Sequence, residues 1–183
     1  MLQVPVPRLE PFVRARTLHY DTDWLSPDPT HVHAHVTALG PFVAPDLLDD
    51  ATFDKVAEIV SSTAAFDFTV ERMDTFPNGI IHLLPDPEGP FRRLTDDLVS
   101  AFPQCPPYAG QFADVRPHLT LDAVSSEVSA ASTARLLADL VLDAGARCRA
   151  ERLDLVHYAP GALRVLRSWR LGDRPGGEVS AVG

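Results

Sequence analysis

The chain has 183 residues, of which 45% are hydrophobic, and it carries a formal net charge of -9. This length fits one domain or two small lobes that share a core, and the apolar content excludes an intrinsically disordered chain. The acidic balance argues against binding along a nucleic-acid duplex, which relies on Lys and Arg to neutralise phosphates.

The cysteine and apolar patterns exclude two further classes of protein. The two cysteines, Cys105 and Cys148, form no Cys-x-x-Cys pair, which argues against a structural zinc site. No apolar run approaches the ~20 residues of a membrane helix, and residues 1–11 do not resemble a signal peptide. We therefore expect a cytoplasmic, monomeric protein that needs no membrane.

The first third of the chain predicts mainly extended structure. Residues 1–11 contain three prolines and are predicted to be an extended lead-in. Residues 12–20 alternate in a way that predicts a strand, and residues 21–29 are rich in Asp, Ser and Pro, as loops are. Residues 31–39 alternate again and predict a strand that ends before Gly40-Pro41.

The rest of the chain alternates between helical and strand patterns. Apolar residues spaced three and four apart predict three helices, at residues 46–60, 88–102 and about 126–142. Period-two patterns bounded by turn residues predict further strands, at residues 66–71, 80–84, 115–124, 147–158 and 162–171. The Gly-rich tail, residues 173–183, is predicted to fray.

Two of the predicted strands carry the same short motif, His-x-Thr. His35-Val36-Thr37 lies in the first and His118-Leu119-Thr120 in the second. Because side chains alternate along a strand, the His and Thr of each motif share one face. The two motifs would form a single site if the fold brings these faces together.

An internal duplication gives a reason to expect that they meet. The motif histidines lie 83 residues apart, the turn glycines Gly79 and Gly161 lie 82 apart, and residues 70–74 resemble residues 150–154 at an offset of 80. We therefore predict an α+β (mixed α/β) fold of two duplicated lobes about a pseudo-two-fold axis, each an antiparallel sheet backed by helices. Residues 1–183 would form one bilobal domain, with repeat units at about 31–85 and 115–171 and a central cleft between the lobes.

Two histidines and two threonines that face one cleft are suited to acid–base chemistry on a phosphodiester. One imidazole can take a proton from the nucleophile while the other protonates the leaving oxygen. The hydroxyls of Thr37 and Thr120 can donate hydrogen bonds to an anionic oxygen. This chemistry requires no cofactor and no metal ion.

The paired motifs resemble the signatures of the 2H phosphoesterase superfamily, in particular its 2′-5′ RNA ligase-like or cyclic phosphodiesterase-like branch. The resemblance includes Gly40-Pro41-Phe42 after the first motif, Pro117 before the second and the closing residues 168–172. It implies a metal-independent phosphodiesterase that opens a 2′,3′-cyclic phosphate on an RNA end or small nucleotide, with 2′-5′ RNA ligase activity as a related reaction. The catalytic positions that carry over are His35, Thr37, His118 and Thr120, with a preference for His118 as base and His35 as acid.

Several nearby side chains are weaker candidates for the same site. Arg116 has the parity of His118 and could contact phosphate, and three aromatic residues could stack on a base: Phe42, Tyr108 and Phe112. Asp122 could orient an imidazole or cap the next turn.

Other conspicuous residues receive structural interpretations. No motif surrounds His19, His82 or His157. Tyr20 and Trp169 are expected in the core or between the lobes. His31 and His33 are expected to line the approach to the cleft or to face solvent.

Two alternative functions remain open at this stage. The cleft could hold a nucleotide or RNA terminus that bears a phosphate without turning it over, as a binding module. Alternatively, the alternating His31, His33 and His35 could mark a His-rich metallo-hydrolase, although further ligands in the right context would be needed. Turnover, calorimetry and elemental analysis distinguish these three functions.

Overall fold

The computed structural model describes residues 1–111, 115–139 and 147–173. Its strands form one antiparallel sheet of eight, in the spatial order β6-β3-β4-β5-β2-β1-β7-β8. The strands are Leu2–Pro5 (β1), His35–Leu39 (β2), Phe66–Thr75 (β3), Ile80–Asp86 (β4), Leu119–Ala123 (β5), Arg147–Ala150 (β6), Arg152–His157 (β7) and Arg164–Arg170 (β8). The α-helices are Glu10–Tyr20 (α1), Asp50–Ser62 (α2), Gly89–Ala101 (α3) and Ala130–Asp139 (α4). Short 3-10 turns occupy Pro7–Leu9 (η1), Thr22–Trp24 (η2), Pro45–Leu47 (η3) and Pro107–Gly110 (η4).

The middle of this sheet is a narrow seam between β2 and β5, the two motif strands. Only one pair of residues, Val36 and Leu119, is registered between them in the described part of the chain. On one side of the seam β5 continues into β4, β3 and β6, and on the other side β2 continues into β1, β7 and β8. The predicted antiparallel sheet backed by helices is therefore confirmed, with the motif strands at its centre.

The two repeat units are interleaved across this seam. β3, which contains residues 70–74, and β7, which contains residues 152–154 of the similar segment, lie third from the seam in opposite halves. The second strand from the seam differs between the halves. It is β4, paired with β5, in one half and the N-terminal strand β1, paired with β2, in the other. Strands from residues 31–85 and 115–171 thus occur in both halves, and a single bilobal domain over residues 1–183 stays a prediction.

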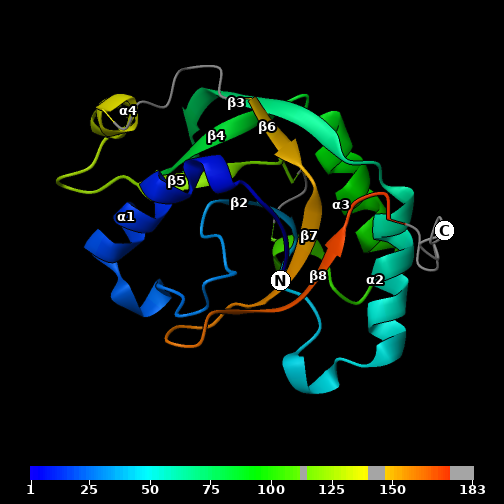
Figure 1. Cartoon of the computed structure of the whole chain (residues 1–183). Helices are drawn as coiled ribbons and strands as arrows, with labels where there is room; N and C mark the ends of the chain where they lie inside the picture. Colours follow the sequence, from blue (N-terminus) through cyan, green and yellow to red (C-terminus); the bar gives the residue numbers. More distant parts are fainter. Residues whose placement is uncertain (112–114, 140–146, 174–183) are drawn as a thin grey trace, which may run out of the picture.

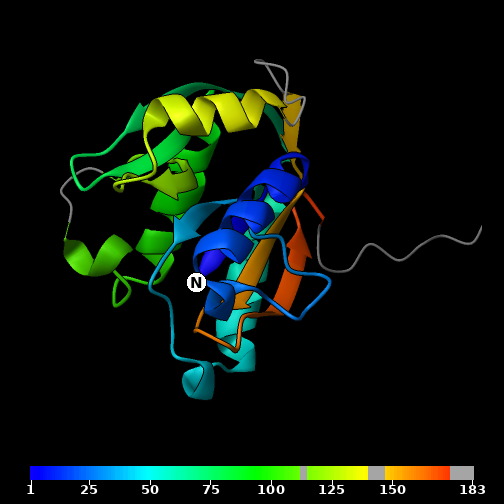
Figure 2. The same cartoon turned by 90° about the vertical axis from the view of Figure 1, so that its left-hand side faces the viewer.

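The helices cover the sheet from two sides. α2 and α3 lie together on the right in Figure 1, and α3 contributes Phe91, Leu94 and Leu98 to the core against β2. α1 and α4 lie on the other side and face the viewer after a 90° turn (Figure 2). α1 contacts β5 across the seam, and α4 contacts β3. The site described below lies beside α1.

The N-terminal part of the chain differs most from the sequence prediction. The predicted strand at residues 12–20 is wrong, because these residues form α1. Pro11 and Glu10 lie in its first turn, where both are favoured, and the buried residues Phe12 and Val13 follow helical rather than alternating spacing. The predicted extended lead-in is confirmed for β1, which is buried between β2 and β7, and is wrong for residues 7–11, which form η1 and the start of α1.

The predicted strand at residues 147–158 is divided in two at Glu151. β6 pairs with β3 at one edge of the sheet, whereas β7 pairs with β1 and β8 in the other half. The other predicted helices and strands are confirmed, with shifted ends. The end of the predicted helix beyond residue 139 and most of the Gly-rich tail lie outside the described residues. None of the helices in the described ranges is long and apolar enough to cross a membrane.

Candidate active site

The seam brings the two His-x-Thr motifs together on one face of the sheet. Because β2 and β5 are antiparallel and Val36 pairs with Leu119, His35 lies opposite Thr120 and Thr37 lies opposite His118. Val36 and Leu119 are buried on the other face, with 1% and 0% of their surface exposed. The structure therefore assembles all four predicted catalytic side chains at the centre of the sheet.

Each motif histidine is held by the same local contact. Nδ1 of His35 lies 2.7 Å from the carbonyl oxygen of His33, and Nδ1 of His118 lies 2.8 Å from the carbonyl oxygen of Arg116. Because a carbonyl can only accept, Nδ1 carries the proton in both rings. In the neutral ring, Nε2 is then left with its lone pair for chemistry in the cleft.

Burial shifts the pKa of both rings downward. It lowers the pKa of His35 from 6.5 to about 4, with further lowering by the nearby His31 and His118. Burial also lowers the pKa of His118, although the hydrogen bond to the Arg116 carbonyl works in the opposite direction. Near neutral pH, both histidines of the free protein are therefore predominantly neutral.

Two cavities adjoin this constellation, one on each side. Cavity I, of about 590 Å³, includes His35, Thr120, Tyr158, Trp24 and Arg16 in its lining. Cavity II, of about 430 Å³, includes Thr37, Tyr108 and Phe42, and Tyr158 borders both. Each volume lies in the range of small-molecule sites.

Tyr108 closes one side of the constellation. Its ring stacks on His118 with the centroids 6.4 Å apart, and its hydroxyl is hydrogen-bonded to the side chain of Thr37. The backbone N–H of Tyr108 donates to the Gly40 carbonyl, which ties η4 to the end of β2. The structure thus brings Tyr108 to the predicted site.

Arg116 and Phe42, two other predicted binding residues, have side-chain partners outside the four motif residues. The Arg116 guanidinium donates to Glu88 Oε1 from both Nε, at 2.8 Å, and Nη2, at 2.6 Å, and it lines neither cavity. Phe42 lines cavity II but packs edge-on against Phe102, with the ring centroids 4.9 Å apart. Phe112 lies outside the described residues.

His82 is a member of this face that the sequence prediction left out. It pairs with Thr120 across β4 and β5, is 1% exposed, and its ring packs edge-on against that of His118, 5.4 Å between centroids. Phe76 stacks on the His82 ring with the centroids 3.8 Å apart and also packs edge-on against His118, 4.8 Å between centroids. No local motif surrounds His82 in the sequence. Only the pairing of β4 with β5 brings it next to His118.

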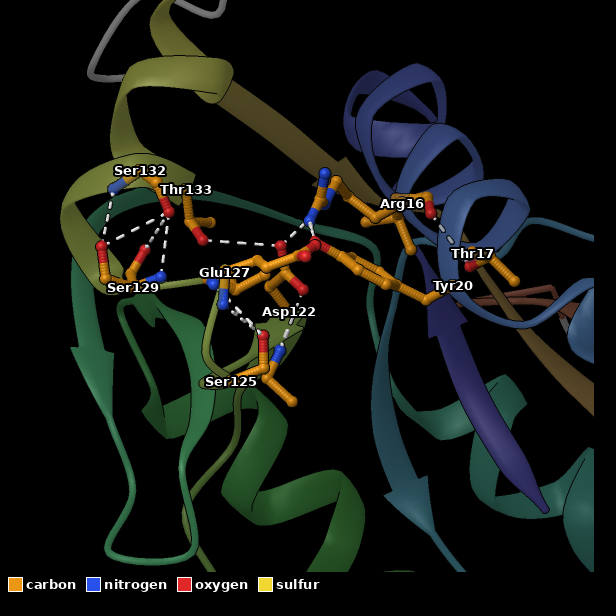
Figure 3. A network of polar contacts seen from close by, with 12 residues as sticks. Arg16, Thr17, Tyr20, Asp122, Ser125, Glu127, Ser129, Ser132 and Thr133 are labelled. Atoms are coloured by element: carbon orange, nitrogen blue, oxygen red, sulfur yellow. Dashed lines mark hydrogen bonds and ion pairs between the residues drawn. The ribbon is translucent and has the colours of Figure 1, made fainter.

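A polar network joins α1 to β5 at the wall of cavity I (Figure 3). Arg16 Nε donates to Asp122 Oδ2 over 2.7 Å, and Thr133 of α4 donates to the same oxygen over 3.5 Å. Arg16 also hydrogen-bonds to the Tyr20 hydroxyl and lies over the Tyr20 ring. Asp122 therefore binds a guanidinium and not an imidazole. Tyr20, which the sequence predicted in the core or between the lobes, is 47% exposed.

The histidines that precede the first motif are buried and not solvated. His33 is 8% exposed, with Nδ1 2.7 Å from Glu10 Oε1 and Nε2 accepting from the Ser26 N–H. His31 is 5% exposed and lines cavity I, as the predicted position on the approach to the cleft requires. Within the described ranges, no three His, Cys, Asp or Glu side chains are grouped so that they could hold a metal ion.

Comparison with known proteins places the chain in a family. A model of the 2′-5′ RNA ligase superfamily matches residues 5–162. The chain belongs to this superfamily. Its membership confirms the resemblance drawn from the paired motifs and supports a phosphodiesterase-type activity.

Solved structures share the superfamily fold with this chain. The protein TT0787 of Thermus thermophilus is 18% identical, with 94% of this chain and 98% of that chain covered at a TM-score of 0.56. Escherichia coli LigT complexed with 3′-AMP is 15% identical, with 94% and 96% covered at a TM-score of 0.53. The search of curated proteins returned no match. These likenesses extend over nearly the whole chain and show a common fold.

Proposed function

We propose that this superfamily member is a metal-independent phosphodiesterase that opens 2′,3′-cyclic phosphates on small nucleotides or RNA ends. The observation that carries the proposal is the pairing at the seam, which sets His35 opposite Thr120 and Thr37 opposite His118. Both rings are anchored through Nδ1, so that two Nε2 atoms remain for the substrate beside the hydroxyls of Thr120 and of Thr37, which is also hydrogen-bonded to Tyr108. The 3′-AMP bound to Escherichia coli LigT is a nucleotide with a phosphate on its ribose, which is compatible with this substrate class.

In the proposed reaction, the phosphorus lies between the two imidazoles. The neutral histidine accepts a proton from water through Nε2 as the water oxygen attacks phosphorus. The P–O bond to one ribose oxygen then breaks, and the protonated histidine supplies the proton that this oxygen needs. The hydroxyls of Thr37 and Thr120 donate to the non-bridging oxygens as their charge grows. The product is a 2′- or 3′-phosphomonoester.

Burial lowers the pKa of both rings, so either histidine can be the neutral base near neutral pH. The preference taken from the sequence, His118 as base and His35 as acid, stays a prediction. If the 5′-hydroxyl of a second RNA end takes the place of water, the same displacement breaks the P–O bond to the 3′-oxygen, protonates that oxygen and gives 2′-5′ ligation.

Hydrolysis of adenosine 2′,3′-cyclic phosphate in the presence of EDTA tests the proposal. We expect turnover in EDTA and a loss of about 10²- to 10⁴-fold in kcat for His35→Ala and for His118→Ala, because each removes one proton-transfer group. The control is His19→Ala, an exposed histidine of α1, which should retain wild-type rates. Activity that persists in both motif variants would contradict the mechanism. Calorimetric binding of 3′-AMP without any turnover would favour the binding module instead.

A further inference from the structure

Cavity I has an unusual concentration of exposed aromatic and apolar surface. In the described part of the chain, six large apolar side chains are exposed, and three of them line this cavity: Tyr20, Val124 and Tyr158. Tyr158 is 45% exposed although it lies beside a catalytic histidine. Clustered exposed apolar groups in a hollow usually mark a binding surface.

Two of the aromatic rings form a continuous wall that begins at the reacting centre. The Tyr158 ring lies edge-on to His35, 6.3 Å between centroids, and the Trp24 ring packs on Tyr158 at 4.8 Å with an interplanar angle of 32°. Trp24 is the last residue of η2, and Tyr158 directly follows β7. A group attached to a phosphate at His35 would therefore meet these rings first on this side.

The aromatic rings on the other side already have partners. In cavity II, Phe42 packs against Phe102, and Tyr108 stacks on His118 while its hydroxyl bonds to Thr37. Phe42 and Tyr108, the candidates chosen from the sequence, are half-buried, whereas Tyr158 is 45% exposed and offers more free ring surface.

The charges in cavity I favour a planar and uncharged group over a second phosphate. Arg16 is the one Arg or Lys that lines either cavity within the described ranges. Its charge is balanced by Asp122 at 2.7 Å, and its guanidinium carbon lies 4.3 Å from the centroid of the Tyr20 ring. The part of the lining formed by Arg16 and Tyr20 thus carries little unbalanced charge with which to attract a second anion.

We propose that cavity I is the nucleobase subsite and that the base of the substrate stacks on Trp24 and Tyr158. The inference rests on the proposed function, because it takes the scissile phosphate to lie at His35. Stacking on aromatic side chains tolerates any base, since every base has a π face. Typical stacking strengths correspond to about a 5- to 150-fold gain in kcat/KM for a substrate with a base over the same substrate without one.

The test compares adenosine 2′,3′-cyclic phosphate with ribose 2′,3′-cyclic phosphate, which lacks the base. Wild-type protein should prefer the adenosine substrate by about 5- to 150-fold in kcat/KM. Trp24→Leu and Tyr158→Leu should lose most of this preference, which is a ratio of two kcat/KM values of the same variant and is therefore independent of any rate change common to both substrates. Leu18→Ala, which alters an exposed apolar residue of α1 that lines neither cavity, is the control and should keep the preference.

A binding measurement separates this inference from the proposed reaction. The chain has two tryptophans, so Trp169→Phe leaves Trp24 as the sole tryptophan fluorophore. Titration with 3′-AMP should then quench the fluorescence, and Tyr158→Leu should weaken the binding by about 5- to 150-fold. Quenching without hydrolysis would overturn the proposed function but support the subsite. An unchanged adenosine preference in Trp24→Leu and Tyr158→Leu, or its loss in Phe42→Leu alone, would overturn the subsite.

Discussion

The ion pair between Arg16 and Asp122 is predicted to hold the two halves of the site together. It joins α1 to β5 across a seam where β2 and β5 share one registered residue pair. Asp122 is 8% exposed, and its carboxylate also accepts from Thr133 and from its neighbour's N–H in β5. Removing the guanidinium would leave this carboxylate buried with only neutral partners.

Arg16→Met is the informative substitution, because it keeps much of the apolar stem and removes the charge. Breaking a buried ion pair from one side costs about 3–5 kcal/mol. The Arg16 side chain is 16% exposed, so we expect the lower end, about 3 kcal/mol. For a chain of this length, that loss lowers Tm by about 6–12 °C. We also expect kcat of the proposed hydrolysis to fall, since His35 and His118 lie on opposite sides of the seam.

Thermal unfolding followed by circular dichroism measures the stability, with Arg14→Met, an exposed arginine of the same helix, as the control. The double variant Arg16→Met/Asp122→Leu should be more stable than Arg16→Met alone, because it no longer buries an unpaired carboxylate. A Tm change for Arg16→Met as small as that of the control would refute the reasoning. Strictly additive effects in the double variant would refute it as well.

Four further predictions concern pH dependence and individual side chains. Because burial lowers the pKa values of His35 and His118, kcat/KM of the proposed hydrolysis should peak below pH 6.5. Between pH 6.5 and about 4, the unfolded chain binds a proton at His35 that the folded chain does not bind. The free energy of unfolding should therefore decrease as the pH falls through this window, and the decrease should be smaller in His35→Gln. His82→Leu, which removes a ring packed edge-on against His118, should lower kcat about 2- to 10-fold with little change in KM, and His82→Phe should lower it less. Glu10→Gln weakens the contacts that tie α1 to the start of β2, including the bond from the Ala34 N–H, and should cost about 1.5–3 kcal/mol in urea unfolding.

Each of these predictions has a result that would contradict it. An equal pH dependence of the free energy of unfolding in His35→Gln and the wild type would show that burial of His35 does not lower its pKa. A kcat/KM optimum at pH 8 would show that the histidines titrate normally or above. Equal kcat values for His82→Leu and the wild type would remove His82 as a positioning residue. An unchanged urea midpoint in Glu10→Gln would show that its two contacts contribute nothing to stability.

The strands and helices that the sequence predicted correctly have a local cause. The motif strands β2 and β5 alternate polar and apolar residues, and α2 and α3 repeat apolar residues at helical spacing. The wrong prediction of a strand at residues 12–20 has a local cause too. Residues 12–20 alternate by chance, whereas their helix is selected by Pro11 at its start and by burial of Phe12 and Val13 on one side.

Residues of the candidate site divide in the same way. The sequence by itself determined that His35 and Thr37, and likewise His118 and Thr120, share a face, because strand geometry sets the direction of residues two apart. Only the tertiary structure decided that the two faces meet, through the pairing of β2 with β5. It also brought His82, Arg16, Trp24 and Tyr158 to the site from four other segments of the chain. Such contacts depend on long-range packing, for which no short pattern in the sequence exists.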